Sequence, residues 1–265
     1  MKDDIKESVL NSLDGRNVEL YPYLPYLLKD LWEIGTSAER VLNLLKRQKR
    51  EFNPSKVKVL DLGCGKGAVS ITLAKTYGFS VVGIDAVPEF VQFAREKAKD
   101  WQVAEKCRFE VNDIREYVNK SDTFDIIILG SIGQVFGNIQ QTLKILSKCL
   151  TADGFIILDD GYIPDGSSYF HNNYLPEAQF DQQIRRSGFR IADFIQYDVD
   201  DIQRGNEYNY SKIKQRAQEL ISMYPGLRYI FDDYLKTQRH ENEVLENHIQ
   251  CMLMLIEKNK EHEKN

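Results

Sequence analysis

The chain has 265 residues, of which 42% are hydrophobic, and its formal net charge at neutral pH is −5. This length and apolar content suit one sizeable α/β domain with additions, or at most two small domains. The acidic balance argues against nucleic acid as the main partner, because binding a polyanion usually needs a concentrated positive face. The apolar runs are too short to span a bilayer, so we expect a cytoplasmic protein without a membrane partner.

The four cysteines are scattered without any Cys-x-x-Cys pair, at Cys64, Cys107, Cys149 and Cys251. Their spacing indicates neither a disulfide framework nor a zinc site, and we expect no bound metal. The oligomeric state is not predicted by any feature of the sequence.

The N-terminal segment, residues 1–53, is expected to be helical. Apolar residues recur there at helical spacing in three patterns, within 5–13, 23–32 and 36–45. Thr36 and Glu39 have the spacing of a capping box at the start of the third pattern, and Asn53-Pro54 ends it. Because these helices precede the first strand, we expect them to cover the edge or the mouth of a sheet as a cap.

Strand and helix patterns alternate from Val57 onwards. Five apolar runs have the length and composition of buried strands, at 57–62, 80–85, 107–111, 124–130 and 154–158. Such alternation implies right-handed crossovers and a parallel sheet with helices on both faces. The sequence therefore predicts an α/β fold of three layers, doubly wound around a mostly parallel seven-stranded sheet.

The last two strands are expected at 189–199 and 249–256. Two amphipathic helical patterns lie between them, and Pro225-Gly226 separates the two patterns. We interpret these patterns as an antiparallel helical hairpin inserted before the last strand. The predicted organisation is a helical cap at 1–53 and a cofactor-binding domain at 54–265, with a cap insertion at about 200–246.

The first strand runs into the sequence DLGCGKG, residues 61–67, in which glycine occupies alternate positions. Glycine lets a backbone turn sharply and approach a ligand with no side chain in the way. In parallel sheets, ligands bind beyond the carboxyl ends of the strands. Aspartates that follow strands, such as Asp61 and Asp113, also cap local turns, which is the structural alternative to binding. The residues predicted to converge at this edge are Gly63, Asp85, Asp113, Gly130 and Asp159.

Residues 57–158 resemble the class I S-adenosylmethionine-dependent methyltransferase family, with its Rossmann-like fold. The GxGxG spacing of residues 63–67 is the most specific part of the resemblance, since a dinucleotide-binding loop would carry GxGxxG. The resemblance implies S-adenosyl-L-methionine as cofactor. It implies that Asp61 helps to hold the methionine amino group, that Asp85 accepts hydrogen bonds from both ribose hydroxyls, and that Asp113 with Ile114 reads the adenine. The other cofactor-binding residues that it implies are Gly63, Cys64, Gly65, Gly67, Ala86, Leu129 and Gly130.

The acceptor is expected to be a small molecule that is methylated by direct in-line transfer. The fourth strand ends in LGSIG, which has neither the DPPY or NPPY motif of base-amino methyltransferases nor the acid of metal-assisted enzymes. Candidates for a catalytic or substrate-binding role are Asp159, Asp160, Tyr162, Tyr21 and His171. For each of them a solvated loop position or ordinary core packing is the structural alternative.

Two functional alternatives stay open at this point. A NAD-dependent oxidoreductase would share the sheet and Asp85, but would place its third glycine later. A non-catalytic S-adenosylmethionine-binding or protein-interaction module would keep the pocket without turnover. Cofactor titration separates the first alternative from a methyltransferase, and a turnover assay separates the second.

Overall fold

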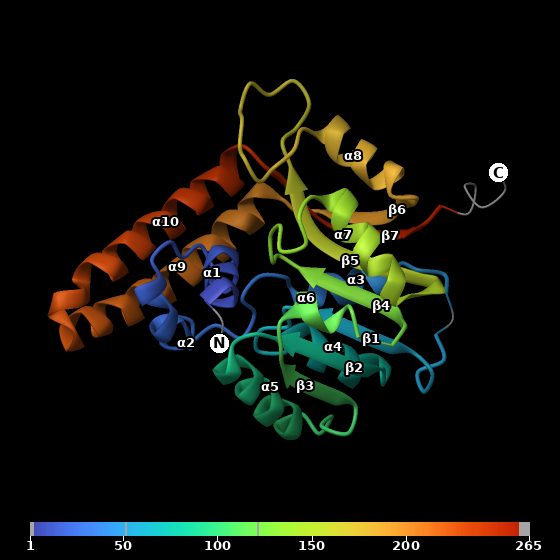
Figure 1. The fold of residues 1–265 in the computed structure, drawn as a ribbon, viewed down its shortest axis with the longest axis horizontal. Helices are drawn as coiled ribbons and strands as arrows, with labels where there is room; N and C mark the ends of the chain where they lie inside the picture. Colours follow the sequence, from blue (N-terminus) through green and yellow to red (C-terminus); the bar gives the residue numbers. More distant parts are fainter. Residues whose placement is uncertain (1–2, 51, 121, 260–265) are drawn as a thin grey trace.

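Seven strands form one sheet in the order β3-β2-β1-β4-β5-β7-β6, as Figure 1 shows. The computed structural model describes residues 3–50, 52–120 and 122–259. Strands β1 to β5 pair in parallel, and β7 runs antiparallel to both β5 and β6. This architecture confirms the predicted doubly wound, mostly parallel sheet. The strands are β1 (Lys58–Leu62), β2 (Ser80–Asp85), β3 (Cys107–Val111), β4 (Phe124–Gly130), β5 (Leu150–Tyr162), β6 (Phe189–Gln196) and β7 (Gln250–Lys258).

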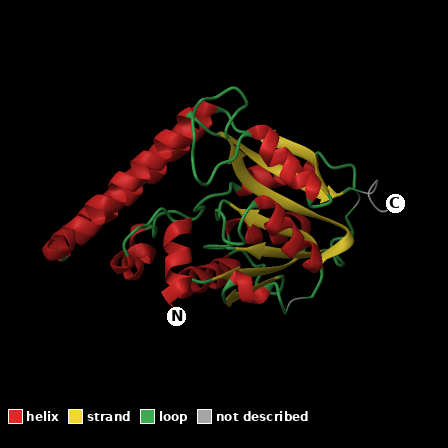
Figure 2. Ribbon diagram, turned by 45° about the horizontal axis from the view of Figure 1, so that its top comes forward, coloured by secondary structure: helices red, strands yellow, loops and turns green. Residues whose placement is uncertain are grey.

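Helices cover both faces of the sheet because its central strands are apolar on both sides. Val59, Leu60 and Ile127 in β1 and β4 are completely buried. One hydrophobic cluster joins a face of the sheet to α3, α4 and α5, and a second joins the opposite face to α6, α7 and α8 (Figure 2). These helices are α3 (Ala38–Lys46), α4 (Ala68–Tyr77), α5 (Pro88–Asp100), α6 (Ile114–Tyr117), α7 (Ile139–Leu146) with the 3-10 turn η2 (Ser147–Cys149), and α8 (Glu177–Arg186).

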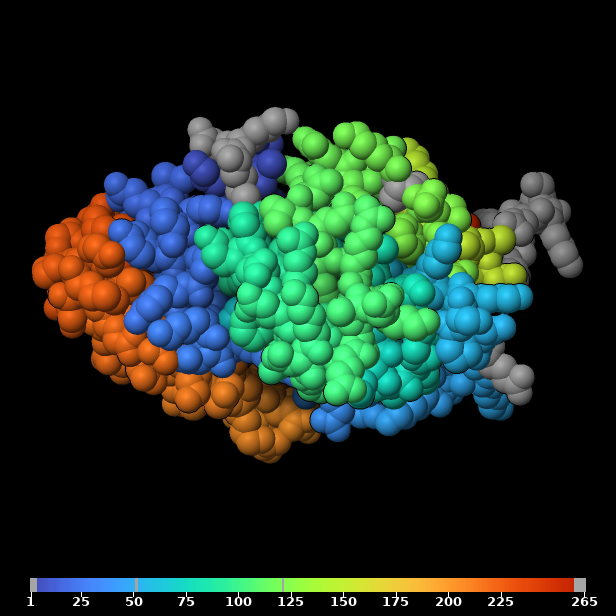
Figure 3. All heavy atoms as spheres, turned by 90° about the horizontal axis from the view of Figure 1, so that it is seen from below, coloured from blue at the N-terminus to red at the C-terminus, as the bar shows by residue number. Residues whose placement is uncertain are grey.

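The remaining helices pack together on one side of the domain. Leu24 and Leu27 of the N-terminal segment share a hydrophobic cluster with Ile213 and Phe231 of the helical hairpin. Figure 3 shows the N-terminal residues, in blue, between the orange hairpin and the green part of the α/β domain. Within the described ranges no helix is long and apolar enough to cross a membrane, the 25-residue α9 included. The elements are α1 (Asp3–Ser12), η1 (Val18–Tyr23), α2 (Leu24–Leu27), α9 (Val199–Met223), η3 (Pro225–Leu227) and α10 (Arg228–Asn247).

Two expectations about the N-terminal segment are wrong in detail. The pattern at 23–32 is not one helix, because prolines at positions 22 and 25 divide it into the 3-10 helix η1 and a single α-helical turn. The third helix starts at Ala38 and has no capping box at Thr36. Its first free N–H, that of Ala38, donates instead to Glu33 Oε1 at 2.9 Å. The hydroxyl of Thr36 is therefore not used to cap the helix.

The C-terminal expectations hold with shifted boundaries. The hairpin helices α9 and α10 extend beyond the amphipathic stretches, and β5 continues to Tyr162 because β7 pairs with it along its whole second half. The division of the chain into a cap and a domain, with residues 1–53 and about 200–246 as cap, stays a prediction.

Candidate cofactor and acceptor site

The turn between β1 and α4 is built from glycines with left-handed backbone angles. Gly63 and Gly65 have φ angles of 72° and 51°, which side-chain-bearing residues rarely adopt. A Cβ on Gly63 would lie 2.6 Å from Ile132 Cγ2, so no side chain fits there. A Cβ on Gly65 would meet only Ile34 Cδ1, at 3.8 Å, because this glycine faces open space. The loop therefore offers bare backbone to that space.

That space is the principal cavity of the protein, with a volume of about 990 Å³ including solvent at its mouth. It lies at the carboxyl ends of β1, β2 and β4, where ligands bind in open α/β sheets. Nine of the eleven residues predicted to bind cofactor line it: Asp61, Gly63, Cys64, Gly65, Asp85, Ala86, Asp113, Ile114 and Gly130.

Asp85 ends β2 and holds the glycine loop through both carboxylate oxygens. The N–H of Gly65 donates to Oδ2 at 2.8 Å, and the N–H of Val87 donates to Oδ1 at 2.8 Å. Burial raises the pKa of Asp85 to about 6, while these backbone hydrogen bonds act in the opposite direction. The carboxylate keeps free lone pairs, so a vicinal diol in the cavity has two acceptor atoms available.

Asp61 lies in β1, one residue before its end, and is 4% exposed. Ser70 Oγ, from the first turns of α4, donates to its Oδ2 at 2.6 Å. Burial raises the pKa of Asp61 to about 6, and the charge of Asp85 adds to the shift. Above that pH the cavity therefore contains two neighbouring carboxylates, which favour a cationic group between them.

Asp113 caps a local turn and also lies in the wall of the cavity. Its Oδ1 accepts the N–H of Arg115 at 2.8 Å and so caps α6. The guanidinium of Arg115 also donates to both carboxylate oxygens, at 2.7 to 3.0 Å. Asp113 and Arg115 both line the cavity, and this pairing fixes the orientation of the carboxylate at its wall.

Gly67 and Leu129, the other two predicted cofactor contacts, lie outside the lining of the principal cavity within the described residues. A Cβ on Gly67 would lie 2.9 Å from both Ala94 Cβ and Phe109 Cζ, so this glycine serves the packing of α4 on α5 and β3. Leu129 faces a second, smaller cavity. Cys64 lines the principal cavity, but burial raises its pKa well above the usual value, as expected for a thiol that fills space.

The two adjacent aspartates of β5, Asp159 and Asp160, have different surroundings. Asp160 lines the second cavity, of about 490 Å³, and burial raises its pKa to about 7. Asp159 also reaches that cavity, but its Oδ2 accepts a hydrogen bond from Tyr197 at 2.8 Å. Ile132 lines both cavities and separates them.

The three aromatic candidates lie away from the lining of both cavities in the described part of the chain. Tyr162 packs on Phe180 of α8, with 5.9 Å between ring centroids. His171 is in the loop before α8, and its Nδ1 accepts the N–H of Asn173. Tyr21 is half-buried, and burial raises the pKa of its phenol, with smaller contributions from the charges of Glu89 and Asp85. Their catalytic roles stay predictions. Within the same described residues, no cluster of three or more His, Cys, Asp or Glu side chains is arranged for a metal ion.

The sequence predicted that the N-terminal helices cover the edge or the mouth of the sheet, but it did not indicate that α1 forms a wall of the cavity. Ile5, Ser8, Val9, Ser12 and Leu13 all line it. Ser12 Oγ donates to the carbonyl of Ile132 at 2.9 Å, which ties α1 to the loop after β4. The amphipathic pattern of α1 showed an apolar face, but the pattern alone does not say whether such a face covers core or ligand.

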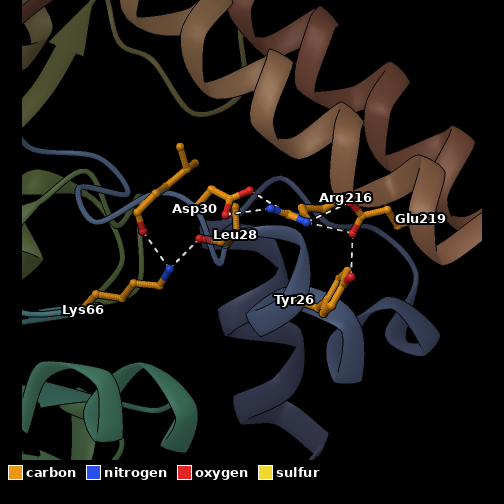
Figure 4. Close-up of polar contacts among 7 residues, drawn as sticks. Tyr26, Leu28, Asp30, Lys66, Arg216 and Glu219 are labelled. Atoms are coloured by element: carbon orange, nitrogen blue, oxygen red, sulfur yellow. Dashed lines mark hydrogen bonds and ion pairs between the residues drawn. The ribbon is translucent and has the colours of Figure 1, made fainter. Parts of the chain in front are cut away.

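Lys66, between two glycines of the loop, was also missed. Its side chain is 4% exposed, and Nζ donates to the carbonyls of Leu28 and Leu31 at 2.5 and 2.7 Å. Figure 4 shows this contact and its continuation into α9. There, Asp30 accepts two hydrogen bonds from Arg216, at 2.6 and 3.0 Å. Lys66 thus connects the cofactor loop to the N-terminal segment, and Asp30 connects that segment to the hairpin.

Replacing Lys66 by methionine is expected to loosen the N-terminal segment. The change keeps the length of the side chain but removes the donor to two backbone carbonyls, at a cost of about 1–3 kcal/mol. Hydrogen exchange at residues 28–36 should become faster. Lys75→Met is the matched control, because Lys75 donates to the carbonyl of Trp101 at the exposed surface. Equal exchange in the two variants would show that Lys66 does not hold the segment.

Comparison with known proteins decides what kind of site this is. Residues 53–215 match the family model described as a methyltransferase domain. The chain belongs to the methyltransferase domain family. This family uses S-adenosylmethionine as methyl donor, so the expected class and cofactor are confirmed. The family match gives no support to the NAD-dependent alternative.

Individual relatives match part of this chain. Norajmaline N-methyltransferase of Rauvolfia serpentina is 29% identical over 46% of this chain and 39% of its own length. Ubiquinone biosynthesis O-methyltransferase of Rickettsia akari is 32% identical over 39% of this chain and 40% of its own. The chain thus spans about two fifths of the length of these curated relatives. The solved SAM-dependent methyltransferase of Geobacter sulfurreducens, in complex with S-adenosyl-L-homocysteine, shares the fold: its TM-score is 0.67, with 17% identity and 97% of each chain covered.

Proposed function

We propose that this protein transfers the methyl group of S-adenosylmethionine to a small-molecule acceptor. The observation that supports it is one cavity in which Asp61, Asp85 and the bare backbone of the glycine loop face a single space. The residues fit the cofactor, because Asp85 offers acceptors to a ribose diol and Asp61 a carboxylate to an ammonium group. Ile114, in the wall beside Asp113, offers an apolar surface to the adenine ring.

The bound cofactor supplies a methyl group that its sulfonium already activates, so the protein needs no covalent intermediate. The chain's own residues hold the two reactants in line and exclude water, and orientation of this kind lowers a barrier by roughly 7–11 kcal/mol. In this structure the cover is α1 with residues 32–36, whose side chains line the cavity opposite the glycine loop. Lys66 keeps that cover in place through the Leu28 and Leu31 carbonyls.

The acceptor that fits the cavity has an apolar body. Ile5 and Val9 of α1 and Leu13 directly after it line the cavity, together with Val135 from the loop after β4. Of the two cations in its described lining, Lys66 is bound to carbonyls and Arg115 to Asp113. The matched relatives are named as nitrogen and oxygen methyltransferases, which agrees with a small organic acceptor.

Calorimetric titration with S-adenosylhomocysteine, followed by a turnover assay on pooled metabolite extracts, tests the proposal. We expect binding of S-adenosylhomocysteine, no binding of NAD, and extract-dependent formation of S-adenosylhomocysteine from S-adenosylmethionine. Binding without turnover across many extracts would favour a non-catalytic module. Binding of NAD alone would refute the assignment of the cavity.

A further inference from the structure

Asp159 is a buried carboxylate surrounded by hydroxyl groups from three other segments. It is 7% exposed. The phenol of Tyr197, ahead of α9, donates to Oδ2 at 2.8 Å. Burial raises the pKa of this carboxyl group, and the side chains of Thr36, ahead of α3, and Ser131, after β4, lie close enough to lower it by hydrogen bonding. A buried carboxylate is costly, and this one, in a central strand, has three neutral hydroxyl groups beside it. Core packing alone does not require such a group.

Two of these hydroxyls also face the principal cavity. Thr36 and Ser131 both line it, and their oxygens lie 3.5 Å apart. The N–H of Ser131 donates to the backbone carbonyl of Asp159 at 3.2 Å, which fixes the two residues relative to one another. A Cβ on Gly130 would lie 2.5 Å from Thr36 Oγ1, so a glycine is needed beside them. Each hydroxyl thus has the carboxyl group on one side and the cavity on the other.

The position of this hydroxyl pair along the cavity determines which part of a bound ligand lies next to it. Asp113 and Asp85, at the ends of β3 and β2, mark the side proposed for the nucleoside, whereas Gly63 and Gly130, at the ends of β1 and β4, lie further along the sheet. Thr36 and Ser131 lie beside Gly130, and therefore beside the part of the cofactor that carries the methyl group. This step rests on the proposed function.

We propose that Thr36 and Ser131 pass a proton from a protic acceptor, an alcohol, phenol or amine, to Asp159. The acceptor's oxygen or nitrogen forms a bond to the methyl carbon, and the carbon–sulfur bond breaks with its electron pair staying on sulfur. The acceptor's proton moves to a hydroxyl oxygen of the pair, and the proton of that hydroxyl moves to the Asp159 carboxylate. A hydroxyl both donates and accepts, so it leaves this exchange unchanged. Asp159 acts through the pair and is a positioning residue.

The groups around Asp159 determine the pH at which its carboxylate can take up a proton. Burial raises its pKa, and hydrogen bonds from Thr36, Tyr197 and Ser131 and the charge of Arg40 lower it. The guanidinium of Arg40 lies 4.0 Å above the Tyr197 ring. Besides these, the titratable groups that face Asp159 are Cys251 of β7, with a pKa of about 12, and Asp160 of its own strand, with a pKa of about 7.

The experiment compares two ligands that differ only where the methyl group is carried. Sinefungin has a protonated amine at that position, whereas S-adenosylhomocysteine has no group there. In the wild-type protein the amine should bind to the hydroxyl pair and, through it, to the carboxylate. Calorimetry gives the ratio of the two dissociation constants without any need for turnover.

Asp159→Asn is expected to lower the affinity for sinefungin relative to S-adenosylhomocysteine by roughly 10- to 100-fold, the usual effect of losing a hydrogen bond to a charged group. Thr36→Val combined with Ser131→Gly should act in the same way, and glycine accepts the left-handed φ of 54° at Ser131. Asp125→Asn is the matched control, because Asp125 lies near the start of β4 and outside the described lining of both cavities, and it should leave the ratio unchanged.

The pH dependence separates a proton acceptor from a structural carboxyl group. The preference for sinefungin should strengthen as the pH rises through the raised pKa of Asp159, because the carboxyl group then loses its proton and becomes negatively charged. The titration of Asp61 and Asp85 cancels in the ratio, because both ligands carry the amino group and the ribose. The pH dependence should persist in Asp125→Asn and disappear in Asp159→Asn.

An unchanged ratio in both Asp159→Asn and the double variant would overturn the proton path while leaving the proposed function intact. If the Asp159→Asn variant does not fold, the double variant Thr36→Val with Ser131→Gly tests the proton path by itself. A wild-type protein that binds neither ligand would overturn the proposed function and the proton path together.

Discussion

Asp85→Asn is expected to weaken the binding of S-adenosylhomocysteine by roughly 100-fold or more. The ribose hydroxyls would donate to a buried carboxylate, and each hydrogen bond to a charged group contributes about 1.5–3 kcal/mol. Asparagine removes the charge and one of the two acceptor oxygens. The side chain also orders the loop, because it accepts the N–H groups of Gly65 and Val87. Both effects act in the same direction, and titration calorimetry at neutral pH measures their sum.

Asp125→Asn is the matched control for this prediction. Asp125 is also a strand aspartate that accepts a backbone N–H, that of Lys58, at 2.9 Å. It lies at the start of β4, the edge of the sheet away from the cavity. We expect its substitution to affect the free energy of unfolding but to leave the dissociation constant within about two-fold of the wild-type value. Equal losses of affinity in the two variants would contradict a ribose-binding role for Asp85.

Gly67→Ala is expected to lower the free energy of unfolding by roughly 2–5 kcal/mol. Its φ of 76° disfavours alanine by about 1–2 kcal/mol. The new Cβ would also lie 2.9 Å from both Ala94 Cβ and Phe109 Cζ, and such overpacking costs about 1–3 kcal/mol more. Urea denaturation followed by fluorescence measures the change.

Gly65→Ala should behave in the opposite way. A Cβ there meets no atom closer than 3.8 Å, so the stability should fall by only about 1–2 kcal/mol, from the backbone angle. Its methyl group would, however, occupy the cavity in which the cofactor is expected, and binding of S-adenosylhomocysteine should be lost. If Gly67→Ala destroys binding while keeping full stability, the division of roles between these two glycines is wrong.

Local patterns were sufficient for the α/β part of the molecule. Buried strands such as β1 and β4 read as continuous apolar runs, and the helices between them carry a face with a period of 3.6 residues. Parallel pairing then places the strand ends at one edge without further information. The positions of Asp61, Asp85 and Asp113 around one cavity follow from that topology.

The glycine motif predicted the position of the loop but not the role of each residue in it. Gly65 faces the cavity, whereas Gly67 faces α5 and β3. Spacing alone treats the two alike, because both are needed for a left-handed backbone. Which one meets the ligand depends on side chains that come from other segments. The same holds for Lys66, which reads as a solvated lysine in the sequence and is buried against Leu28 and Leu31.

By itself, the sequence determined the order of the strands and helices along the chain and the edge of the sheet that binds ligand, because both follow from short-range periodicity. The class of cofactor followed from the resemblance of its motifs to a known family. Only the tertiary structure decided that α1 walls the cavity and that Thr36, Ser131 and Tyr197 converge on Asp159. These three hydroxyls come from segments about 60 to 100 residues apart. Contacts between residues so far apart in the sequence depend on how whole helices and strands pack together. No periodic pattern in the sequence indicates them.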